Sequence, residues 1–380
     1  MNKVNIFRSS NYGEVLQRNV KRPTVISNIK IKLRDAFAIL ASGFGYSNAA
    51  DFCTITKKPL ISQSSFYDYQ KKMEPILRKL AENICAEKVR IALQNNELVV
   101  AFDAGWAHRR NAHQCIGALL DVLTGYVLAF HIVHHSNEEN ATLSHTDKSS
   151  NIMEKIALEA ILKQNDISKV PSVTVVHDCD IGANNIIQDL WPTANVLYDP
   201  NHFTRSQSRK IDRICSENIE LNSIKERITK FYSCLMHDRT LDLEQKVSNW
   251  KNALNHYIET EGWTQENNGK TIEALKNLIE EFSKTFSEVN SNFSTNICES
   301  FNKARCLPAN KDTAWRISWR LRAYISIIRW NDDNWIQTIL NEFEIYDNDQ
   351  TCSQISRQKR NLTKSNRKTE ISRKNRSIKR

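Results

Sequence analysis

The chain has 380 residues, 40% of them hydrophobic, and its eight tryptophans indicate a sizeable core in one large domain or in two to three smaller ones. It has no run of 18 apolar residues and no hydrophobic leader, so we expect an intracellular protein that neither spans a membrane nor is secreted. The net charge is +10, and nine cysteines without a Cys-x-x-Cys pair favour a reducing compartment and argue against a structural zinc finger.

The first 95 residues divide into a polar arm, residues 1–30, and a helical segment, residues 31–95. The run from Leu33 to Gly43 is typical of an amphipathic helix ended by glycine, and a second helix opens near Ser62. Two or three short helices of this kind could form a helix-turn-helix-like module that touches DNA. The alternative is a helical cap that packs on another domain or mediates dimers.

Residues 96–204 have the character of a sheet with two helices. Helices are expected near residues 150–164 and 182–190, and the turn Leu123-Thr-Gly125 predicts a hairpin. The order β-β-β-α-β-α-β predicts an α/β fold with an RNase H-like mixed five-stranded sheet and flanking helices. The apolar runs that predict the strands are residues 97–103, 114–122, 126–134, 172–178 and 195–199.

Residues 205–293 carry three apolar stripes at helical spacing, which predicts an all-helical insertion into the sheet domain. Residues 294–345 would complete that domain with two more helices. The tail, residues 346–380, holds the positive charge, since Arg357 to Arg380 contain 11 Lys or Arg and one acid, whereas the rest has 42 bases and 42 acids. We expect a disordered tail, either merely solvated or serving as a nuclear-localisation or nucleic-acid-contacting arm.

Three acidic residues stand where an active site could form. Asp103 ends the first apolar run, Asp178 ends the fourth, and Glu299 lies near the start of a late helix. Carboxylates on two neighbouring strand ends and one helix can hold two divalent metals for phosphoryl transfer. Alone, each has a simpler explanation as a turn or helix-dipole residue. Asp180 is the alternative to Asp178, although it could instead cap the following helix.

Several nearby residues could support such a site. His202, just after the fifth run, could contact a phosphate or be a structural histidine. Arg109 and Arg110 follow Asp103 closely, and arginine suits phosphate binding. Trp106 could stack on an unpaired base or belong to the core.

Taken together, these segments resemble the Mutator-like family of DDE transposases over roughly residues 97–335. The run from Asp103 to Arg109 is similar to the family's Asp-Gly-x-Trp-x-x-Arg block, with alanine in place of the usual glycine. His177-Asp-Cys-Asp180 is similar to its Asp-Gly-Asp element, Asp199-Pro-Asn-His202 to its Asp/Cys-x-x-His signature, and Asn296 to Asn302 to its Asn-x-x-Glu-Ser-x-Asn block. Thr124-Gly-Tyr-Val-Leu128 is similar to the hairpin that follows the first block, and Ser149-Ser-Asn-Ile-Met-Glu154 to a Ser-Ser-x-x-Met-Glu stretch of one branch of the family.

The resemblance implies a transposase that cuts transposon ends and joins them to target DNA. Asp103, Asp178 and Glu299 would be the catalytic acids and would hold two Mg²⁺ or Mn²⁺ ions, with Asn302 supporting them. The partners implied are double-stranded DNA and further copies of the chain, in a dimer or higher assembly. The basic tail predicts a nuclear location if the source is eukaryotic. Two alternatives remain: a domesticated, non-catalytic DNA-binding protein on the same fold, and an RNase H-fold nuclease.

Overall fold

The computed structural model describes residues 29–94, 97–108, 112–135, 144–146, 150–164, 167, 170, 172–313, 315 and 318–345. The chain divides into two compact units. One contains the described residues up to Ala81, Leu307–Asn310 and those from Trp315 onward, and the other contains the rest. The predicted basic tail and nearly all of the predicted N-terminal arm lie outside the described residues.

The larger unit is built on one mixed sheet, whose strands lie in the order β4-β3-β2-β1-β5-β6. Strand β2 pairs antiparallel with both neighbours, whereas β1, β5 and β6 are parallel. This order confirms the predicted RNase H-like sheet and adds one short edge strand, β4, that the sequence did not suggest. The strands are β1 (Glu97–Trp106), β2 (Gln114–Asp121), β3 (Val127–His135), β4 (Ser144–Thr146), β5 (Ser172–His177) and β6 (Asn195–Tyr198).

Strand β1 is longer than its apolar run, because it continues to Trp106 instead of ending at Asp103. The extension pairs only with β2, from Asp103 opposite Ala118 to Trp106 opposite Cys115. Pairing with β5 stops earlier, at Ala101 opposite Val176. Past that point β1 no longer pairs with β5, and both Asp103 and Asp178 lie there.

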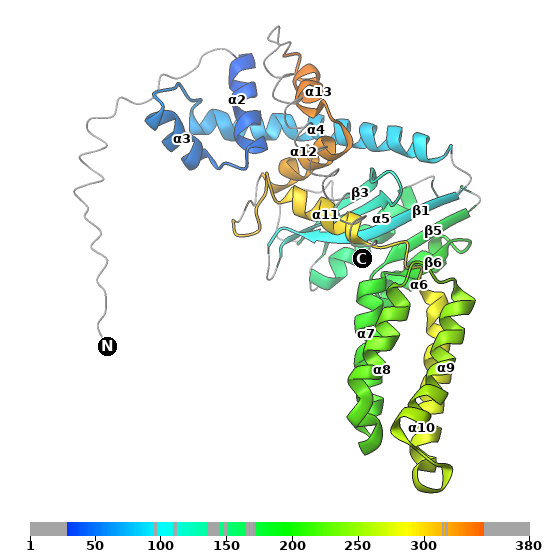
Figure 1. Cartoon of the computed structure of the whole chain (residues 1–380). Helices are drawn as coiled ribbons and strands as arrows, with labels where there is room; N and C mark the ends of the chain where they lie inside the picture. Colours follow the sequence, from blue (N-terminus) through cyan, green and yellow to red (C-terminus); the bar gives the residue numbers. More distant parts are fainter. Residues whose placement is uncertain are drawn as a thin grey trace, which may run out of the picture. The chain divides into compact units, whose positions relative to one another are not determined.

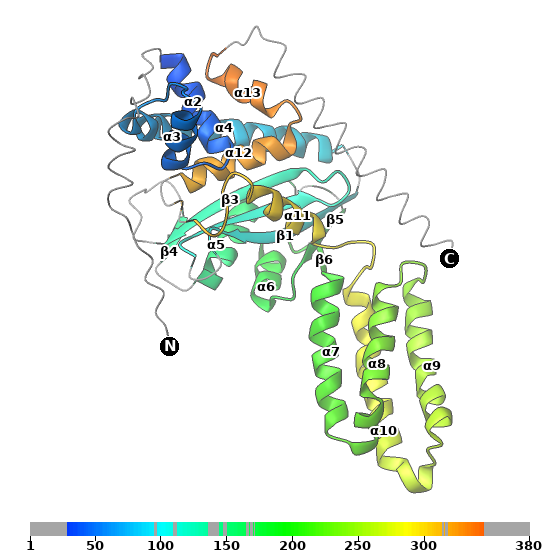
Figure 2. The ribbon, with the colours of Figure 1, turned by 60° about the vertical axis from the view of Figure 1, so that its left-hand side comes forward.

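The two faces of the sheet are covered by different helices (Figures 1 and 2). Helices α5 (Ser150–Gln164) and α6 (Ile181–Leu190) share the main apolar core with alternate β1 residues such as Val100 and Phe102. Helix α11 (Asn296–Arg305) contacts β1 and β2. Because side chains alternate along a strand, Asp103 and Gly105 face α11 while their even-numbered neighbours face α5.

The predicted helical insertion is present as four helices that run side by side (Figures 1 and 2). They are α7 (Pro200–Ser216), α8 (Ile219–His237), α9 (Leu243–Glu261) and α10 (Gln265–Ser283), followed by the short helix η2 (Lys284–Glu288). Trp250 and Tyr232 lie fully buried among Phe282, Phe286 and the aliphatic residues of the predicted stripes. Helix α7 begins at Pro200, so the segment carrying His202 is already the first turn of this bundle.

The smaller unit contains the predicted N-terminal helices together with the last two helices. These are α2 (Ile29–Ala41), α3 (Tyr46–Ile55), the start of α4 (Gln63–Ala92), α12 (Trp319–Asn331) and α13 (Trp335–Glu342). The buried Arg322 joins them, since its guanidinium stacks on Trp315 and donates to the carbonyls of Leu40, Phe44 and Pro308. DNA contact by these helices stays a prediction. No helix in the described ranges is long and apolar enough to cross a membrane.

Candidate active site

Asp103 lies on the part of β1 that does not pair with β5, and its carboxylate is held by two hydrogen bonds. Its Oδ1 accepts from the backbone N–H of Ala104 at 2.7 Å, and its Oδ2 accepts from Asn302 Nδ2 at 2.9 Å. Burial raises the pKa of this carboxyl, and the charge of Glu299 adds to the rise, whereas the two hydrogen bonds and His202 oppose it. A strand and a helix 199 residues apart in sequence therefore fix the first carboxylate.

Asp178 and Asp180, two residues apart, have different surroundings. Asp180 caps α6, because its Oδ1 accepts from the N–H groups of Gly182 and Ala183 at 2.6 and 3.2 Å, and Lys155 Nζ lies 3.4 Å away. Burial raises the pKa of Asp180, but these hydrogen bonds and Lys155 together bring it below the ordinary value. Asp178 instead contacts the late part of the chain, since its Oδ1 accepts from Thr295 Oγ1 at 3.5 Å.

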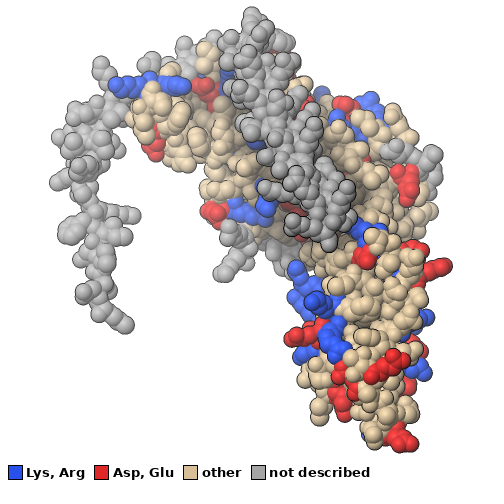
Figure 3. Space-filling model, in the orientation of Figure 1, with Lys and Arg blue, Asp and Glu red and all other residues tan. Residues whose placement is uncertain are grey.

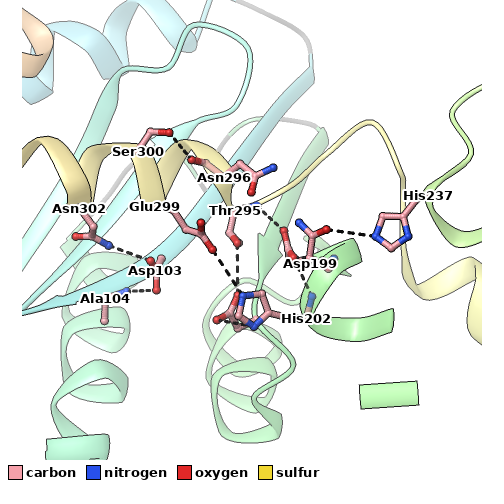
Figure 4. A network of polar contacts seen from close by, with 12 residues as sticks. Asp103, Ala104, Asp199, His202, His237, Thr295, Asn296, Glu299, Ser300 and Asn302 are labelled. Carbon is pink, nitrogen blue, oxygen red and sulfur yellow. Dashed lines mark hydrogen bonds and ion pairs between the residues drawn. The ribbon is translucent and has the colours of Figure 1, made fainter. Parts of the chain in front are cut away.

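His202 lies close to two of the predicted acids, Asp178 and Glu299, and Figure 4 draws its contact with Glu299. Its Nδ1 lies 3.5 Å from Asp178 Oδ2, and its Nε2 lies 3.8 Å from Glu299 Oε1. The ring thus links the end of β5 with the first turn of α11, and it comes from α7. Glu299 is the more accessible carboxylate, with 61% of its side chain exposed against 38% for Asp178.

The buried carboxylate of Asp199 holds these segments together. Only 1% of this residue is exposed. Its Oδ1 accepts from the N–H groups of Asn201 and His202 at 2.9 and 3.1 Å, which caps α7. Its Oδ2 accepts from the N–H of Thr295 at 2.8 Å, the residue before α11 (Figure 4). One side chain therefore fixes the helix that carries His202 and the helix that carries Glu299.

Asn302 fits closely against β1 because residue 105 is a glycine. A Cβ at Gly105 would lie 2.1 Å from Asn302 Oδ1 and 2.8 Å from Arg305 Nη2. Arg305 is fully buried and donates to the Trp106 carbonyl at 3.2 Å. Thus Asn302 and Arg305, one turn apart on α11, seat this helix on the strand that carries Asp103.

Negative charge is concentrated around these groups. Burial first, and then the charges of Asp103, Asp199 and Glu299, raise the pKa of Asp178 to about 6, although His202 opposes the rise. A further carboxylate, Glu154 of α5, belongs to the same electrostatic cluster: burial and the charges of Asp103, Asp178 and Asp180 raise its pKa to about 7. Glu154 was not among the predicted site residues, although it lies in a stretch that resembles the family.

The carboxylate oxygens of the site suit a divalent cation, but these side chains do not form a complete set of ligands around one point. Among the described residues, no three acidic, histidine or cysteine side chains lie close enough to hold one ion as they stand. Asp178 and Glu299 are both turned toward His202. Their chemistry nevertheless fits Mg²⁺ or Mn²⁺, which prefer carboxylate oxygens. A cation would offset the repulsion between the carboxylates, which adds to the effect of burial on their pKa values.

The remaining predicted residues fall into two groups. Trp106 is half-buried and packs against the small core cluster of Ala104, Cys115 and Met153, on the face of the sheet opposite Asp103. This packing favours the core interpretation of Trp106 over base stacking. Arg109 and Arg110 lie outside the described residues.

The fold and the grouped acids agree with a comparison against protein-family models. The family model described as "Mutator-like transposase" matches residues 16–264, which is more than half of the chain. This range includes Asp103, Asp178 and His202 but ends before Glu299, so the match does not cover that residue. No curated protein matches the chain. The chain therefore belongs to the Mutator-like transposase family.

Proposed function

We propose that the chain is an active DDE-type transposase, which cuts double-stranded DNA at transposon ends and joins the released ends to target DNA. The observation that carries the proposal is the meeting of four separate segments of the chain at one place. His202 from α7 contacts Asp178 after β5 and Glu299 on α11, while Asn302 of α11 binds Asp103 on β1. A site that served only to bind DNA would gain nothing from such a concentration of carboxylates, because they repel phosphate.

Asp103, Asp178 and Glu299 would hold the two ions, Mg²⁺ or Mn²⁺. Bound there, the ions would stabilise the charge that develops on the phosphate oxygens and lower the pKa of the attacking water. Asp180 has a different role in this proposal, because its carboxylate is already committed to the N–H groups of α6 and to Lys155.

The reaction has two displacements at phosphorus. In the first, a water oxygen bonds to the scissile phosphorus, the P–O3′ bond breaks, and the leaving oxygen takes a proton to become a 3′-OH. In the second, this 3′-OH bonds to a target phosphorus and displaces a 3′ oxygen of the target strand. When protonated, His202 would place positive charge beside the scissile phosphate, and Asn302 would keep Asp103 oriented throughout both steps.

Two further proposals accompany this activity. Paired cutting of both transposon ends favours a dimer or higher assembly on DNA, and the basic tail favours a nuclear location in a eukaryote. One active site can carry out both steps in turn, because the 3′-OH made in the first displacement is the nucleophile in the second.

A nicking assay on supercoiled plasmid with Mg²⁺ or Mn²⁺ tests the activity. We expect Asp103→Asn, Asp178→Asn and Glu299→Gln each to slow nicking at least about 100-fold, because each removes several kcal/mol of transition-state stabilisation. Asp242→Asn is the matched control: Asp242 caps α9 and is exposed, and asparagine caps equally well. DNA binding without nicking by the unaltered protein would support the domesticated alternative, and preferential cutting of RNA–DNA hybrids would support the nuclease.

A further inference from the structure

A basic face on α7 begins at the candidate active site. Arg205, Arg209 and Arg213 follow His202 by 3, 7 and 11 residues. At 3.6 residues per turn, all four side chains leave the helix within an arc of about 80°. The face that presents His202 to Asp178 and Glu299 therefore continues along the helix as a row of arginines, about 17 Å long from the histidine to the last arginine.

These arginines are exposed, and none of them has an acidic partner in the part of the chain that the structure describes. Within the described residues, no carboxylate forms an ion pair with Arg205, Arg209 or Arg213. The one acid of α7, Asp212, accepts a hydrogen bond from Thr229 Oγ1 of α8 at 2.9 Å, so its carboxylate is engaged with the neighbouring helix. Asp212 lies at the edge of this face, and the row from Arg205 to Arg213 itself carries positive charge alone, whereas a face used only for solubility usually mixes both signs.

The charge is unevenly divided between the helices of the insertion. Helix α7 has four basic residues and one acid, whereas α9 and α10 together have four basic residues and seven acids. Figure 3 shows Lys and Arg gathered on the left-hand side of the bundle, where Figure 1 draws α7. The positive potential is therefore a local property of α7 and not of the insertion as a whole.

We propose that this arginine face of α7 binds the phosphate backbone of the DNA duplex leading away from the scissile phosphate. Arginine binds phosphate oxygens well, and a 17 Å row spans about five phosphates of one strand at about 3.4 Å of helix axis each. The duplex is identified as the partner because the row starts at the residue that faces the site of proposed phosphoryl transfer. The inference thus depends on the proposed function and assigns the insertion a part in holding its substrate.

The salt dependence of DNA binding tests this surface. The full chain is titrated, without divalent metal, onto a labelled random-sequence duplex of about 30 base pairs, three helical turns. The triple variant Arg205→Gln, Arg209→Gln, Arg213→Gln should reduce the slope of log K against log salt by about 2.7, since each lost phosphate contact removes about 0.9. The single variant Arg209→Gln, the less disruptive change, should reduce it by about 0.9.

The matched control is Lys251→Gln, Lys276→Gln, Lys284→Gln, which removes the same charge from exposed positions elsewhere on the insertion. Its slope should stay close to that of the unaltered protein. The proposal would be overturned if the salt slope changed equally in both triple variants or changed in neither. It would also be overturned if polyglutamate at equal charge displaced the DNA from α7. Nicking is measured on the same proteins. If the salt slopes change as expected but no nicking occurs, only the proposed activity is contradicted. If nicking occurs but the salt slopes do not change, only the proposed DNA-binding surface is contradicted.

Discussion

Replacing Asp199 with asparagine changes one atom of a buried side chain that holds two helix ends. The carboxylate accepts three backbone hydrogen bonds, two through Oδ1 from α7 and one through Oδ2 from Thr295. Asparagine can keep one oxygen toward α7 and remain a good N-cap. The side-chain NH2 of asparagine then faces the N–H of Thr295. The charge-assisted hydrogen bond from Thr295 is lost, and two N–H donors face each other in a buried position.

The lost bond sets the magnitude. A hydrogen bond to a charged group contributes about 1.5–3 kcal/mol, and the facing donors add to the loss. We expect the free energy of unfolding of the larger unit to fall by about 2–3 kcal/mol. The change at Asp242→Asn, whose carboxylate is exposed and caps α9 only, should stay within about 0.5 kcal/mol.

Hydrogen–deuterium exchange followed by mass spectrometry locates the effect, because the two units need not unfold together. In Asp199→Asn, exchange should accelerate at Thr295 and the first turn of α11 more than at His202. Nicking should slow while the protein remains folded, and the Mn²⁺ concentration for half-maximal nicking should rise, because Glu299 is less well placed. Unchanged exchange at Thr295, or slower nicking at an unchanged half-maximal Mn²⁺ concentration, would refute this reasoning.

Three other predictions follow from the site. Asp180→Asn should retain far more nicking activity than Asp178→Asn, because asparagine still caps α6; equal losses would mean that Asp180 is the metal ligand. Gly105→Ala should push Asn302 away from Asp103 and lower both Mn²⁺ affinity and nicking, whereas wild-type Mn²⁺ affinity would show that Asn302 does not orient the carboxylate. Glu154→Gln should stabilise the metal-free protein by about 2–3 kcal/mol at pH 8 and not at pH 4, measured by urea unfolding in EDTA. The sign follows from the raised pKa of Glu154, whose carboxyl ionises near pH 4.5 in the unfolded chain but only near pH 7 in the folded one. The unaltered protein therefore loses stability between pH 4.5 and pH 7, and the glutamine variant does not. A difference in stability that does not depend on pH would contradict this prediction.

The sheet was predictable because its strands are apolar runs bounded by turn residues. The hairpin at Gly125, which has a φ of 78°, follows directly from the Leu-Thr-Gly turn. The extension of β1 was not predictable, since Ala104-Gly-Trp106 has no strand pattern and forms a strand only because β2 lies beside it. Strand β4, three residues long, is too short to give any periodic signal.

The acids were predictable individually, but their relations were not. A carboxylate after an apolar run can be read from the sequence, and so can the possibility that Asp180 caps a helix. The role of Asp199 depends on Thr295, which is 96 residues away, and nothing in the local sequence indicates that contact. The place of Glu154 in the site was not predictable for the same reason, because its nearness to Asp103 and Asp178 arises from the packing of α5 and not from the spacing of the residues.

The contact between Asp199 and Thr295 has a consequence for the order of folding. Closing a flexible loop of 96 residues costs about 4 kcal/mol of chain entropy, which is more than one hydrogen bond returns. The helices of the insertion make mostly local contacts with one another, so they can fold before that loop closes. A folded bundle that already brings its two ends together removes most of this entropic cost. We therefore expect the groups of the candidate site to assemble late. Mutations that slow folding of the bundle should delay the appearance of the proposed activity after refolding more than they delay the formation of helix.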